Sequence, residues 1–361
     1  MYCETLEKIG KCFQIPGRLQ TFKEVHSGNI NSTYKVNYST ELIAEQSYII
    51  QKINTDVFQS PPDLMYNIEM VTKHLRQKLK TIEYHKTLNG ASFYFDGKHY
   101  WRAYDFIPGA TYDCCRDLEL IHNAGNAYGD LSRTMAEIDP FQLRVILPDF
   151  HNIKKRYEML RFSFEKDSYG RSSISKDEYD YLLSVMDTAC AIMQRPGPLR
   201  VVHNDTKISN IIFDGKKPIA VIDFDNVMPG YVWQDFGDAV RSMANSAKED
   251  EENLLNVHFD FDAFCAFASG FLEKATRMLT ISEIDVLAVS CFSITCELAV
   301  RFLTDFLNGD VYFKTTRERH NLIRCRSQIA LATDMWRNIR QMEAVIHNLV
   351  NSFGGDNIAA K

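Results

Sequence analysis

The sequence lacks the features that mark several classes of protein. Its nine cysteines include no C-x-x-C pair and no ladder of short spacings, which argues against a zinc site or a secreted disulfide framework. Basic residues are not in surplus, because 41 Lys and Arg stand against 47 Asp and Glu and the net charge is −6. A protein that coats nucleic acid needs such a surplus for its phosphate contacts, so we expect no nucleic-acid partner.

Long apolar runs are also missing. The longest, 286–296, stops at Glu297 and is shorter than the ~18 residues that a membrane span requires. Glu4, Glu7 and Lys8 in the first turns are unlike the apolar core of a signal peptide. We therefore expect a cytoplasmic protein with reduced cysteines and no membrane partner.

The composition that is present supports a large core. Hydrophobic residues make up 45% of the chain and charged residues 24%, as in ordinary globular proteins. At about 150 residues per domain, the 361 residues indicate roughly two folding units.

The residues before Pro108-Gly109 are typical of strands with one helix. The hairpin signal Asp96-Gly97 and segments rich in β-branched and aromatic residues predict strands over 33–38, 47–53, 93–95 and 99–102. Between these pairs, Ser60, two prolines and apolar residues at steps of three and four predict a helix over 60–79.

Helical patterns dominate the rest of the chain. They cover about 117–138, 152–166, 175–194, 232–247, 259–278, 282–308 and 317–350, and only 199–225 alternates short apolar runs with polar turns. We predict an α+β fold with two lobes. A small β-rich lobe (1–107) is expected to bind nucleotide, and a larger, mostly helical lobe (108–361) to carry catalysis and substrate binding.

The strand-rich stretch contains the residues that indicate chemistry. His203, Asp205, Lys207 and Asn210 form the pattern H-x-D-x-K-x-x-N, and Asp223 follows an apolar run eighteen residues after Asp205. Phosphoryl transfer needs a carboxylate that orients the attacking hydroxyl and accepts its proton, which we assign to Asp205. It also needs oxygen ligands for Mg²⁺, here Asn210 and Asp223, and a cation beside the transferred group, here Lys207. We interpret His203 as a scaffold for the loop.

The small lobe is expected to hold ATP. The turn at 26–33, with Gly28, Asn29 and Ser32, is suited to placing backbone amides over phosphates. Lys52 ends the next strand, where kinases place the lysine that binds phosphates. On the following helix, Glu69 is its expected ion-pair partner and Asn67 a second candidate. The segment with Tyr104, Phe106 and Ile107 joins the lobes and is expected to present backbone groups to adenine.

A second motif resembles a kinase signature but has the wrong position. Asp235-Phe236-Gly237 contains the letters D-F-G, yet it lies in a helical segment and thirty residues after Asp205, while Asp223 already fills the metal position. We interpret Asp235 as a brace behind the catalytic loop. No A-P-E segment follows and the glycine loop is not G-x-G-x-x-G, which favours a small-molecule kinase over a protein kinase.

These motifs resemble those of the aminoglycoside and choline phosphotransferase superfamily, whose fold is protein-kinase-like. More narrowly, the chain is similar to the N-acetylhexosamine 1-kinases over about 25–245 and again over about 301–312. The most specific piece is the strand end and turn Gln51-Lys52-Ile53-Asn54-Thr55-Asp56-Val57-Phe58. Two positions depart from the pattern: Asn29 stands where relatives often have histidine, and Lys52 where many have arginine.

The resemblance implies transfer of the ATP γ-phosphate to the anomeric hydroxyl of N-acetylglucosamine or N-acetylgalactosamine with Mg²⁺. It assigns Asp205 as base, Asn210 and Asp223 as metal ligands, and Arg301 and Tyr312 as sugar contacts. A neutral sugar also needs hydrogen-bonding and stacking groups, and Asn226, Tyr231 and Trp233 are further candidates. We expect a monomer or a weak homodimer.

Two alternatives remain open at this point. The first is another kinase of the superfamily, acting on an aminoglycoside, choline, homoserine or a different sugar. Cationic substrates of this kind favour an acidic pocket, for which Glu297, Asp305 and Asp310 are available. The second is a nucleotide-binding regulator without turnover, which the presence of base, metal ligands and lysine disfavours.

Overall fold

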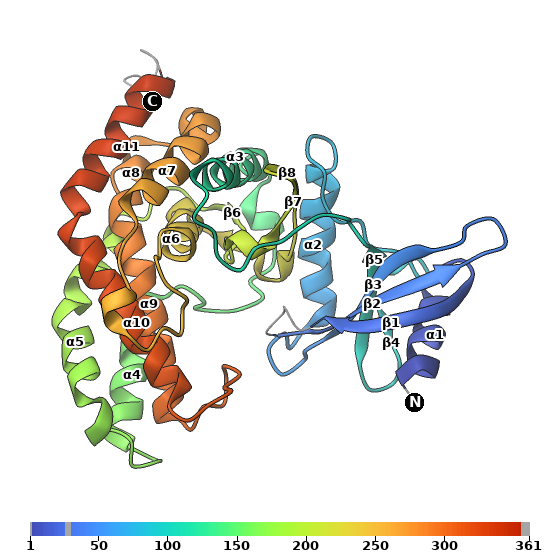
Figure 1. Ribbon diagram of the computed structural model, residues 1–361, viewed down its shortest axis with the longest axis horizontal. Coiled ribbons are helices and arrows are strands. Elements are labelled where there is room, and N and C mark those ends of the chain that lie inside the picture. Colours follow the sequence, from blue (N-terminus) through green and yellow to red (C-terminus); the bar gives the residue numbers. More distant parts are fainter. Residues whose placement is uncertain (1, 26–29, 355–361) are drawn as a thin grey trace.

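The protein has two lobes of unequal size, as Figure 1 shows for the computed structural model, which describes residues 2–25 and 30–354. The smaller lobe contains an antiparallel sheet in the order β1-β2-β3-β5-β4, and the larger one is mostly helical. The α+β class and the two-lobed arrangement predicted from the sequence are confirmed. The small-lobe elements are α1 (Tyr2–Cys12), β1 (Arg18–Val25), β2 (Ser32–Ser39), β3 (Gln46–Ile53), α2 (Pro61–Leu75), β4 (Tyr94–Phe95) and β5 (Tyr100–Asp105).

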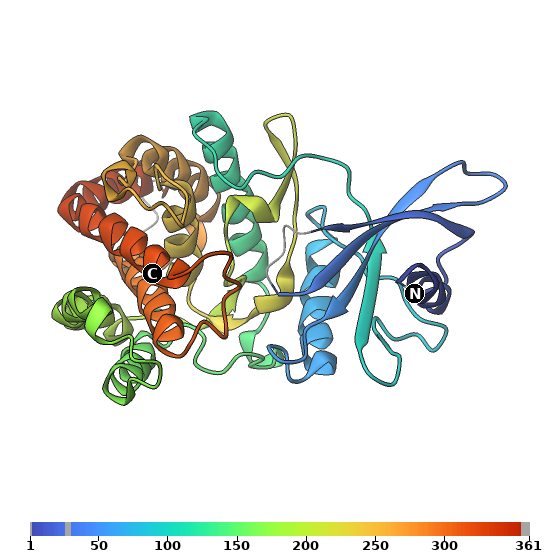
Figure 2. The ribbon, with the colours of Figure 1, turned by 60° about the horizontal axis from the view of Figure 1, so that its bottom comes forward.

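The small sheet is covered by one helix on each face. Leu6 and Ile9 of α1 pack on the outer face against Tyr48 and Ile50 of β3. Helix α2 stands on the inner face, between the sheet and the large lobe (Figures 1 and 2). The sequence analysis missed α1 and β1. Successive side chains of a strand point to opposite faces, so this arrangement decides which β2 and β3 residues meet the other lobe.

Helix α2 is fixed to the large lobe as well as to the sheet. Its Asn67 amide donates to the carbonyls of Arg144 and Val227 at 2.8 and 2.9 Å and accepts from the Arg144 amide at 2.9 Å. The helix ends at Leu75, four residues before the predicted end at 79. The Ser60 hydroxyl donates to the Asp63 carboxylate at 2.7 Å instead of capping the backbone.

The predicted helices of the large lobe are all present, with two divisions, and the segment predicted over 282–308 forms the helices Ile281–Ile284 and Leu287–Leu307. The segment predicted over 317–350 forms two helices that meet at Asn338. The large-lobe elements are α3 (Leu118–Met135), α4 (Ile153–Lys166), α5 (Lys176–Cys190), β6 (Arg200–Val202), β7 (Ile211–Asp214), β8 (Lys217–Val221), β9 (Met228–Gly230), α6 (Val232–Met243), α7 (Phe261–Ala275), α8 (Ile281–Ile284), α9 (Leu287–Leu307), α10 (His320–Arg337) and α11 (Ile339–Gly354).

Helix α9 forms the centre of the large lobe. It is long and apolar enough to cross a membrane by length and composition, but most of it is buried inside the protein. It packs against α4, α5, α6 and α10 through residues such as Phe292, Leu303 and Phe306. The burial gives its apolar composition an ordinary explanation, that of a core helix.

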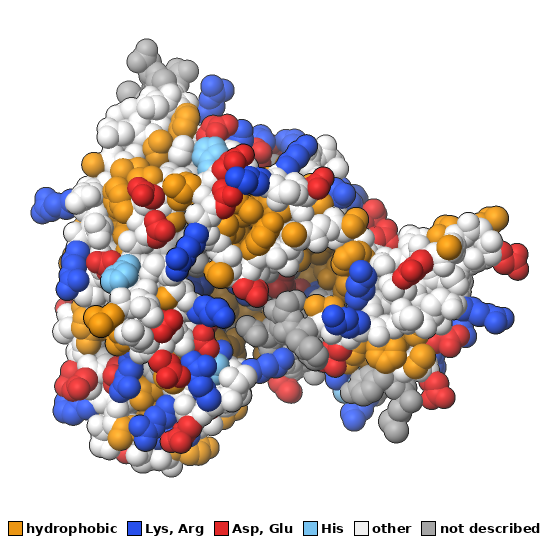
Figure 3. Space-filling model, viewed as in Figure 1, with side chains coloured by type: hydrophobic (Ala, Val, Ile, Leu, Met, Phe, Trp, Pro, Cys, Tyr) orange, Lys and Arg blue, Asp and Glu red, His pale blue; other side chains and the backbone are white. Residues whose placement is uncertain are grey.

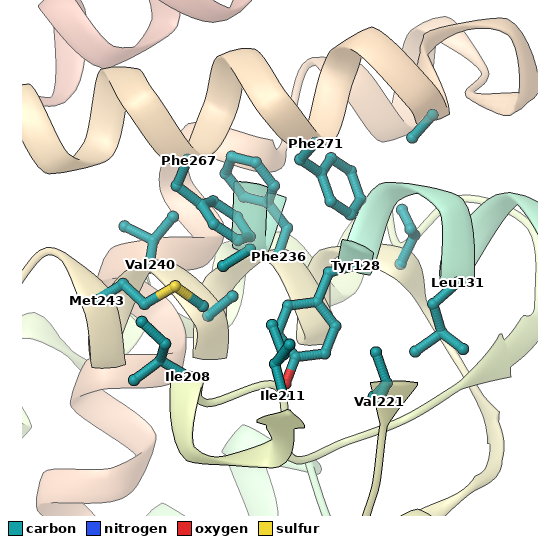
Figure 4. Close-up of a cluster of buried hydrophobic side chains, with 14 of the residues drawn as sticks. Tyr128, Leu131, Ile208, Ile211, Val221, Phe236, Val240, Met243, Phe267 and Phe271 are labelled. Atoms are coloured by element: carbon teal, nitrogen blue, oxygen red, sulfur yellow. The ribbon is translucent and has the colours of Figure 1, made fainter. Parts of the chain in front are cut away.

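The hydrophobic core continues to the residues that flank the predicted catalytic loop. Figure 4 shows Phe236 and Val240 of α6 and Phe267 and Phe271 of α7 gathered beside Tyr128, with Ile208 and Ile211 below them. Helices α3 and α7 approach each other closely at glycines. A Cβ built on Gly270 would lie 2.0 Å from the His122 carbonyl oxygen, and one on Gly125 would lie 2.3 Å from that of Phe267.

The close approach of α3 and α7 predicts a large effect of a single methyl group. Gly270→Ala forces the two backbones apart, and we expect a loss of about 2–3 kcal/mol in the free energy of unfolding, as for other overpacked cores. Urea denaturation measures this loss. The neighbouring Ser269→Ala, on the same helix, serves as control and should change stability by less than about 0.5 kcal/mol. Equal effects of the two substitutions would contradict the proposed role of the glycine contact.

Candidate active site

The catalytic-loop motif lies between β6 and β7 and is held from behind by a buried carboxylate. The two oxygens of Asp235 accept from the amides of His203 and Asn204 at 2.9 and 2.7 Å, and Asp238 accepts from the Thr206 amide at 3.0 Å. Burial raises the pKa of Asp235, although these amide hydrogen bonds act in the opposite direction. The structure therefore places Asp235 in the brace position expected from the sequence.

The backbone of this loop is not relaxed. Asn204 has φ of 62°, in the left-handed region that Asn tolerates better than most residues. The Asn204 amide group donates to the carbonyl of Asn226 at 2.9 Å, and the His203 ring donates to that of Ile222 at 3.0 Å. These bonds tie the loop to the turn that carries Asp223. His203 thus acts as a scaffold, as its place in the motif suggests.

Asp205, Lys207 and Asn210 come together at the end of this loop. The Asn210 amide donates to the Asp205 carboxylate at 3.0 Å, and the Lys207 ammonium lies 3.1 Å from the same oxygen. The pKa of Lys207 is raised, chiefly by the negative charge of Asp205, so the lysine stays protonated. Because the Asn210 nitrogen is occupied by Asp205, its amide oxygen is left for another ligand.

Asp223 follows β8 in a strained turn beside other carboxylates. Its φ of 66° is left-handed, and the next three residues, Phe224–Asn226, form a 3-10 turn. Burial raises its pKa to about 7, and the charges of Asp225 and Asp205 act in the same direction. Strained backbone and a strongly shifted carboxyl are both typical of functional sites.

A cleft of about 460 Å³ between the lobes brings these residues together. Figure 3 shows the hollow, with Lys and Arg side chains near it. It is lined by most of the residues predicted for catalysis, metal, hinge and acceptor, namely Asp205, Lys207, Asn210, Asp223, Tyr104, Phe106, Ile107, Arg301 and Tyr312. Asp205 and Asp223 therefore face one cavity, which is the arrangement that phosphoryl transfer requires.

A family of known enzymes matches this chain over more than half of its length. The model of the phosphotransferase enzyme family, APH, matches residues 21–267, which include both lobes' cleft-lining strands and the motif residues 203–225. The chain belongs to this phosphotransferase family.

Solved structures show the same protein-kinase-like fold as this phosphotransferase at low identity. A microcompartment-associated aminopropanol kinase has a TM-score of 0.67 at 15% identity, over 94% of this chain and 98% of that one. A spectinomycin phosphotransferase in complex with ADP and spectinomycin has 0.62 at 14%, over 92% and 98%. Choline kinase from Cryptosporidium parvum has 0.58 at 14%, over 96% and 99%.

Three small-lobe residues predicted to bind nucleotide lie elsewhere in this phosphotransferase. Ser32 and Lys52 pair across β2 and β3, and the residues of these strands that line the cleft are instead Thr33, Lys35, Ile49 and Gln51. The side-chain alternation of strands explains the error, because positions one residue away face the other lobe. The expected Lys52–Glu69 ion pair is not formed, since Glu69 binds Lys86.

Tyr231 and Trp233, which were candidates for contacts to the sugar, do not line the cleft. Tyr231 is not among the cleft residues; its ring stacks on Trp233 with centroids 6.1 Å apart, and its amide donates to Gln234 at the start of α6. Trp233 is itself buried in the large-lobe core. Gly28 and Asn29 lie outside the described residues.

The sequence analysis missed two buried pairs that line the cleft. Arg102 of β5 binds both oxygens of Asp225, at 2.6 and 2.9 Å. His151 donates through Nδ1 to Glu297 at 2.8 Å, with both side chains nearly inaccessible. Charge alone gives no signal of such pairing, because the partners are more than a hundred residues apart.

The oxygen atoms around Asp223 fit a hard divalent cation. The donors are the Asp223 carboxylate and the free amide oxygen of Asn210, and the excess negative charge that raises the Asp223 pKa favours a cation there. Within the described ranges, no three His, Cys, Asp or Glu side chains group as a metal site. Mg²⁺ commonly takes one or two protein carboxylates and completes its shell with water and substrate phosphates, so this set is sufficient.

The raised pKa of Asp223 predicts how stability depends on pH. Because the folded state binds this proton more tightly than the unfolded state, with a pKa of about 7 against 3.8, the charged carboxylate costs stability above pH 7. We expect Asp223→Asn to stabilise the metal-free protein on the order of 2 kcal/mol at pH 8, and much less at pH 4. Urea denaturation at both pH values measures this. Asp214→Asn, on the exposed β7–β8 turn, is the control, and a matching gain there would refute the assignment.

Proposed function

We propose that this phosphotransferase is an ATP- and Mg²⁺-dependent kinase that phosphorylates the anomeric hydroxyl of an N-acetylhexosamine. The family establishes phosphotransfer, and structural relatives include complexes with ADP and with AMP-PNP. The choice of a sugar as the acceptor comes from the resemblance of the sequence to the N-acetylhexosamine 1-kinases. The choice among substrates rests on one observation, which is how the charged groups at the acceptor end of the cleft are already paired.

The buried acids at this end already have partners within the chain. Glu297 is bound by His151, and Asp238 lies 2.9 Å from Arg241. The two other candidate acids have structural partners: Asp305 accepts from the backbone amides of 311–313, and Asp310 binds Arg171. A cationic aminoglycoside or amino alcohol would find little uncompensated negative charge here, and a neutral sugar needs none.

Arg301 gives the acceptor end its donors. Its guanidinium lies over the rings of Phe150, Tyr312 and Phe313, with centroid distances of 5.0, 5.8 and 5.6 Å. Among the described residues it has no ion-pair partner. A guanidinium that aromatic rings orient and no carboxylate occupies is suited to hydrogen-bond the carbonyl or hydroxyl oxygens of a sugar.

The cleft also has residues with hydrogen-bond acceptors for a sugar. The amide oxygens of Asn204 and Asn226, which line the cleft, accept no hydrogen bond from the described residues. Buried acceptors without partners are costly unless a ligand or water satisfies them. Sugar hydroxyls are donors that match such acceptors, whereas the quaternary ammonium group of choline has no donor hydrogen.

The chemistry follows from the arrangement around Asp205. Its carboxylate orients the anomeric hydroxyl and accepts the proton as the bond to phosphorus forms, a task made easier because this hydroxyl is more acidic than an ordinary alcohol. Lys207 offsets the negative charge that spreads over the transferred phosphoryl oxygens. Asn210 and Asp223 would hold Mg²⁺, which would supply positive charge beside the nucleotide phosphates.

The proposed function predicts which compound receives the phosphate. The protein is incubated with ATP, Mg²⁺ and separate acceptors: N-acetylglucosamine, N-acetylgalactosamine, glucose, choline, aminopropanol and spectinomycin. We expect a sugar 1-phosphate signal by phosphorus NMR with the N-acetylated sugars. Asp205→Asn should lose nearly all turnover while retaining ADP binding by titration calorimetry. Turnover confined to choline, aminopropanol or spectinomycin would overturn the sugar assignment, and near-wild-type turnover of Asp205→Asn would overturn the base.

Arg301 allows the acceptor assignment to be tested separately. Arg301→Ala removes donors to the sugar alone, so we expect the sugar KM to rise about tenfold or more while the ATP KM stays within about twofold, since a lost charged hydrogen bond costs ~1.5–3 kcal/mol. Arg301→Lys keeps the charge but not the planar fork and should recover only part of the loss. Steady-state kinetics with each substrate varied in turn distinguishes the two KM values, and equal rises in both would disprove the placement.

A further inference from the structure

A buried ion pair connects the two lobes directly at the turn that carries Asp223. Arg102 extends from β5, in the small lobe, and Asp225 belongs to the 3-10 turn Phe224–Asn226, in the large lobe. Their atoms meet in a two-pronged contact at 2.6 and 2.9 Å, and only 1% of Arg102 and 3% of Asp225 is exposed. Paired contacts of this geometry fix orientation as well as distance.

A second small-lobe side chain holds the same carboxylate. The Asn31 amide donates to Asp225 at 2.5 Å, while its own oxygen accepts from the Asn54 amide at 2.9 Å. Arg102 is fixed in turn through its Nε, which donates to Gln51 at 2.9 Å. Two side chains of the small lobe, Asn31 and Arg102, therefore converge on one carboxylate of the large lobe. We call Asn31, Arg102 and Asp225 the inter-lobe latch.

The latch is present in a small lobe that, in its described residues, lacks an ion pair between its β3 lysine and the following helix. Active protein kinases join a lysine of β3 to a glutamate of the following helix. Here the β3 lysine, Lys52, is not among the cleft residues, and Glu69 of α2 binds Lys86. The buried cation of this sheet is Arg102, and its partner lies across the cleft. The ion pair thus connects the small lobe to the catalytic turn itself.

Asp225 of the latch follows Asp223 by two residues, and the buried Phe224 lies between them in the sequence. Phe224 is fully buried in the large-lobe core, so the turn is held from the core side at Phe224 and from the small lobe at Asp225. Asp223 itself makes no hydrogen bond or ion pair with the described residues through its carboxylate. Its left-handed backbone must therefore be maintained by its neighbours.

We propose that the inter-lobe latch positions Asp223 and sets the closure of the nucleotide cleft, with Arg102, Asp225 and Asn31 acting as positioning residues. The inference uses phosphotransfer by this family and the place of Asp223, and it does not depend on which acceptor is phosphorylated. Loss of the latch should affect nucleotide binding and leave acceptor binding nearly unchanged.

Asn31 provides the mildest test, because it contributes one hydrogen bond across the cleft and no buried charge. We expect Asn31→Ala to weaken ADP binding by roughly fivefold to tenfold in titration calorimetry, as expected when a positioned group is released. The acceptor KM should stay within about twofold. Hydrogen exchange of peptides covering 219–230 should become faster. Ser39→Ala, at the end of β2 farthest from Asn31 and outside the cleft lining, is the control and should change none of these quantities.

The ion pair is tested by removing both charges together, because either single loss leaves an unpaired buried charge. We expect the double variant Arg102→Met/Asp225→Leu to fold, with ADP binding weakened more than in Asn31→Ala and faster exchange in 219–230. If it does not fold, Asn31→Ala decides the question. Wild-type ADP affinity and exchange in Asn31→Ala would overturn the latch. ADP binding needs no acceptor, so this outcome is separate from a failure of the sugar assignment.

Discussion

The arrangement of this phosphotransferase depends on a carboxylate that performs no chemistry. Asp235 is buried, its pKa is raised by that burial, and it nevertheless receives the backbone amides of His203 and Asn204. These amides would otherwise be unsatisfied donors in a left-handed turn, which is expensive inside a protein. With Asp235 in place, the turn presents Asp205 to the cleft at a fixed angle. The residues that we propose for catalysis, Asp205 and Lys207, come directly after the two amides held by this set of hydrogen bonds.

The two lobes contribute different physical properties to the cleft. The large lobe supplies the concentrated negative charge of Asp205, Asp223 and Asp225 around a strained turn, an arrangement that a divalent cation and nucleotide phosphates complete. The small lobe supplies Arg102, which neutralises one of the three carboxylates before any ligand arrives. Asp205 lies beside Lys207, so Asp223 is the carboxylate of this cluster that has no cationic partner within hydrogen-bonding distance among the described residues. This division explains why a strongly acidic cluster coexists with a stable fold.

Much of this structure was accessible from the sequence, and the exceptions have a common cause. Local patterns predicted the helices of the large lobe and the hairpin at Asp96-Gly97, because periodicity and turn chemistry act over a few residues. The spacing of Asp205, Asn210 and Asp223 predicted their convergence for a similar reason: a short loop and a hairpin join them. Lys52 was misplaced by the two-residue alternation of a strand whose register the sequence does not specify. The partners of Glu69, Glu297 and Asp225 depend on contacts between distant segments.

The three hydrogen bonds of Asn67 distinguish this enzyme from regulated protein kinases. In those proteins the helix after β3 moves between positions, and its movement switches activity. Here the corresponding helix, α2, is bound through Asn67 to backbone groups of the large lobe, and swinging it outward would break three hydrogen bonds. An off state reached by rotating that helix is therefore disfavoured. Without this helix switch, we expect the enzyme to be active whenever its substrates are bound, so its turnover should follow their concentrations.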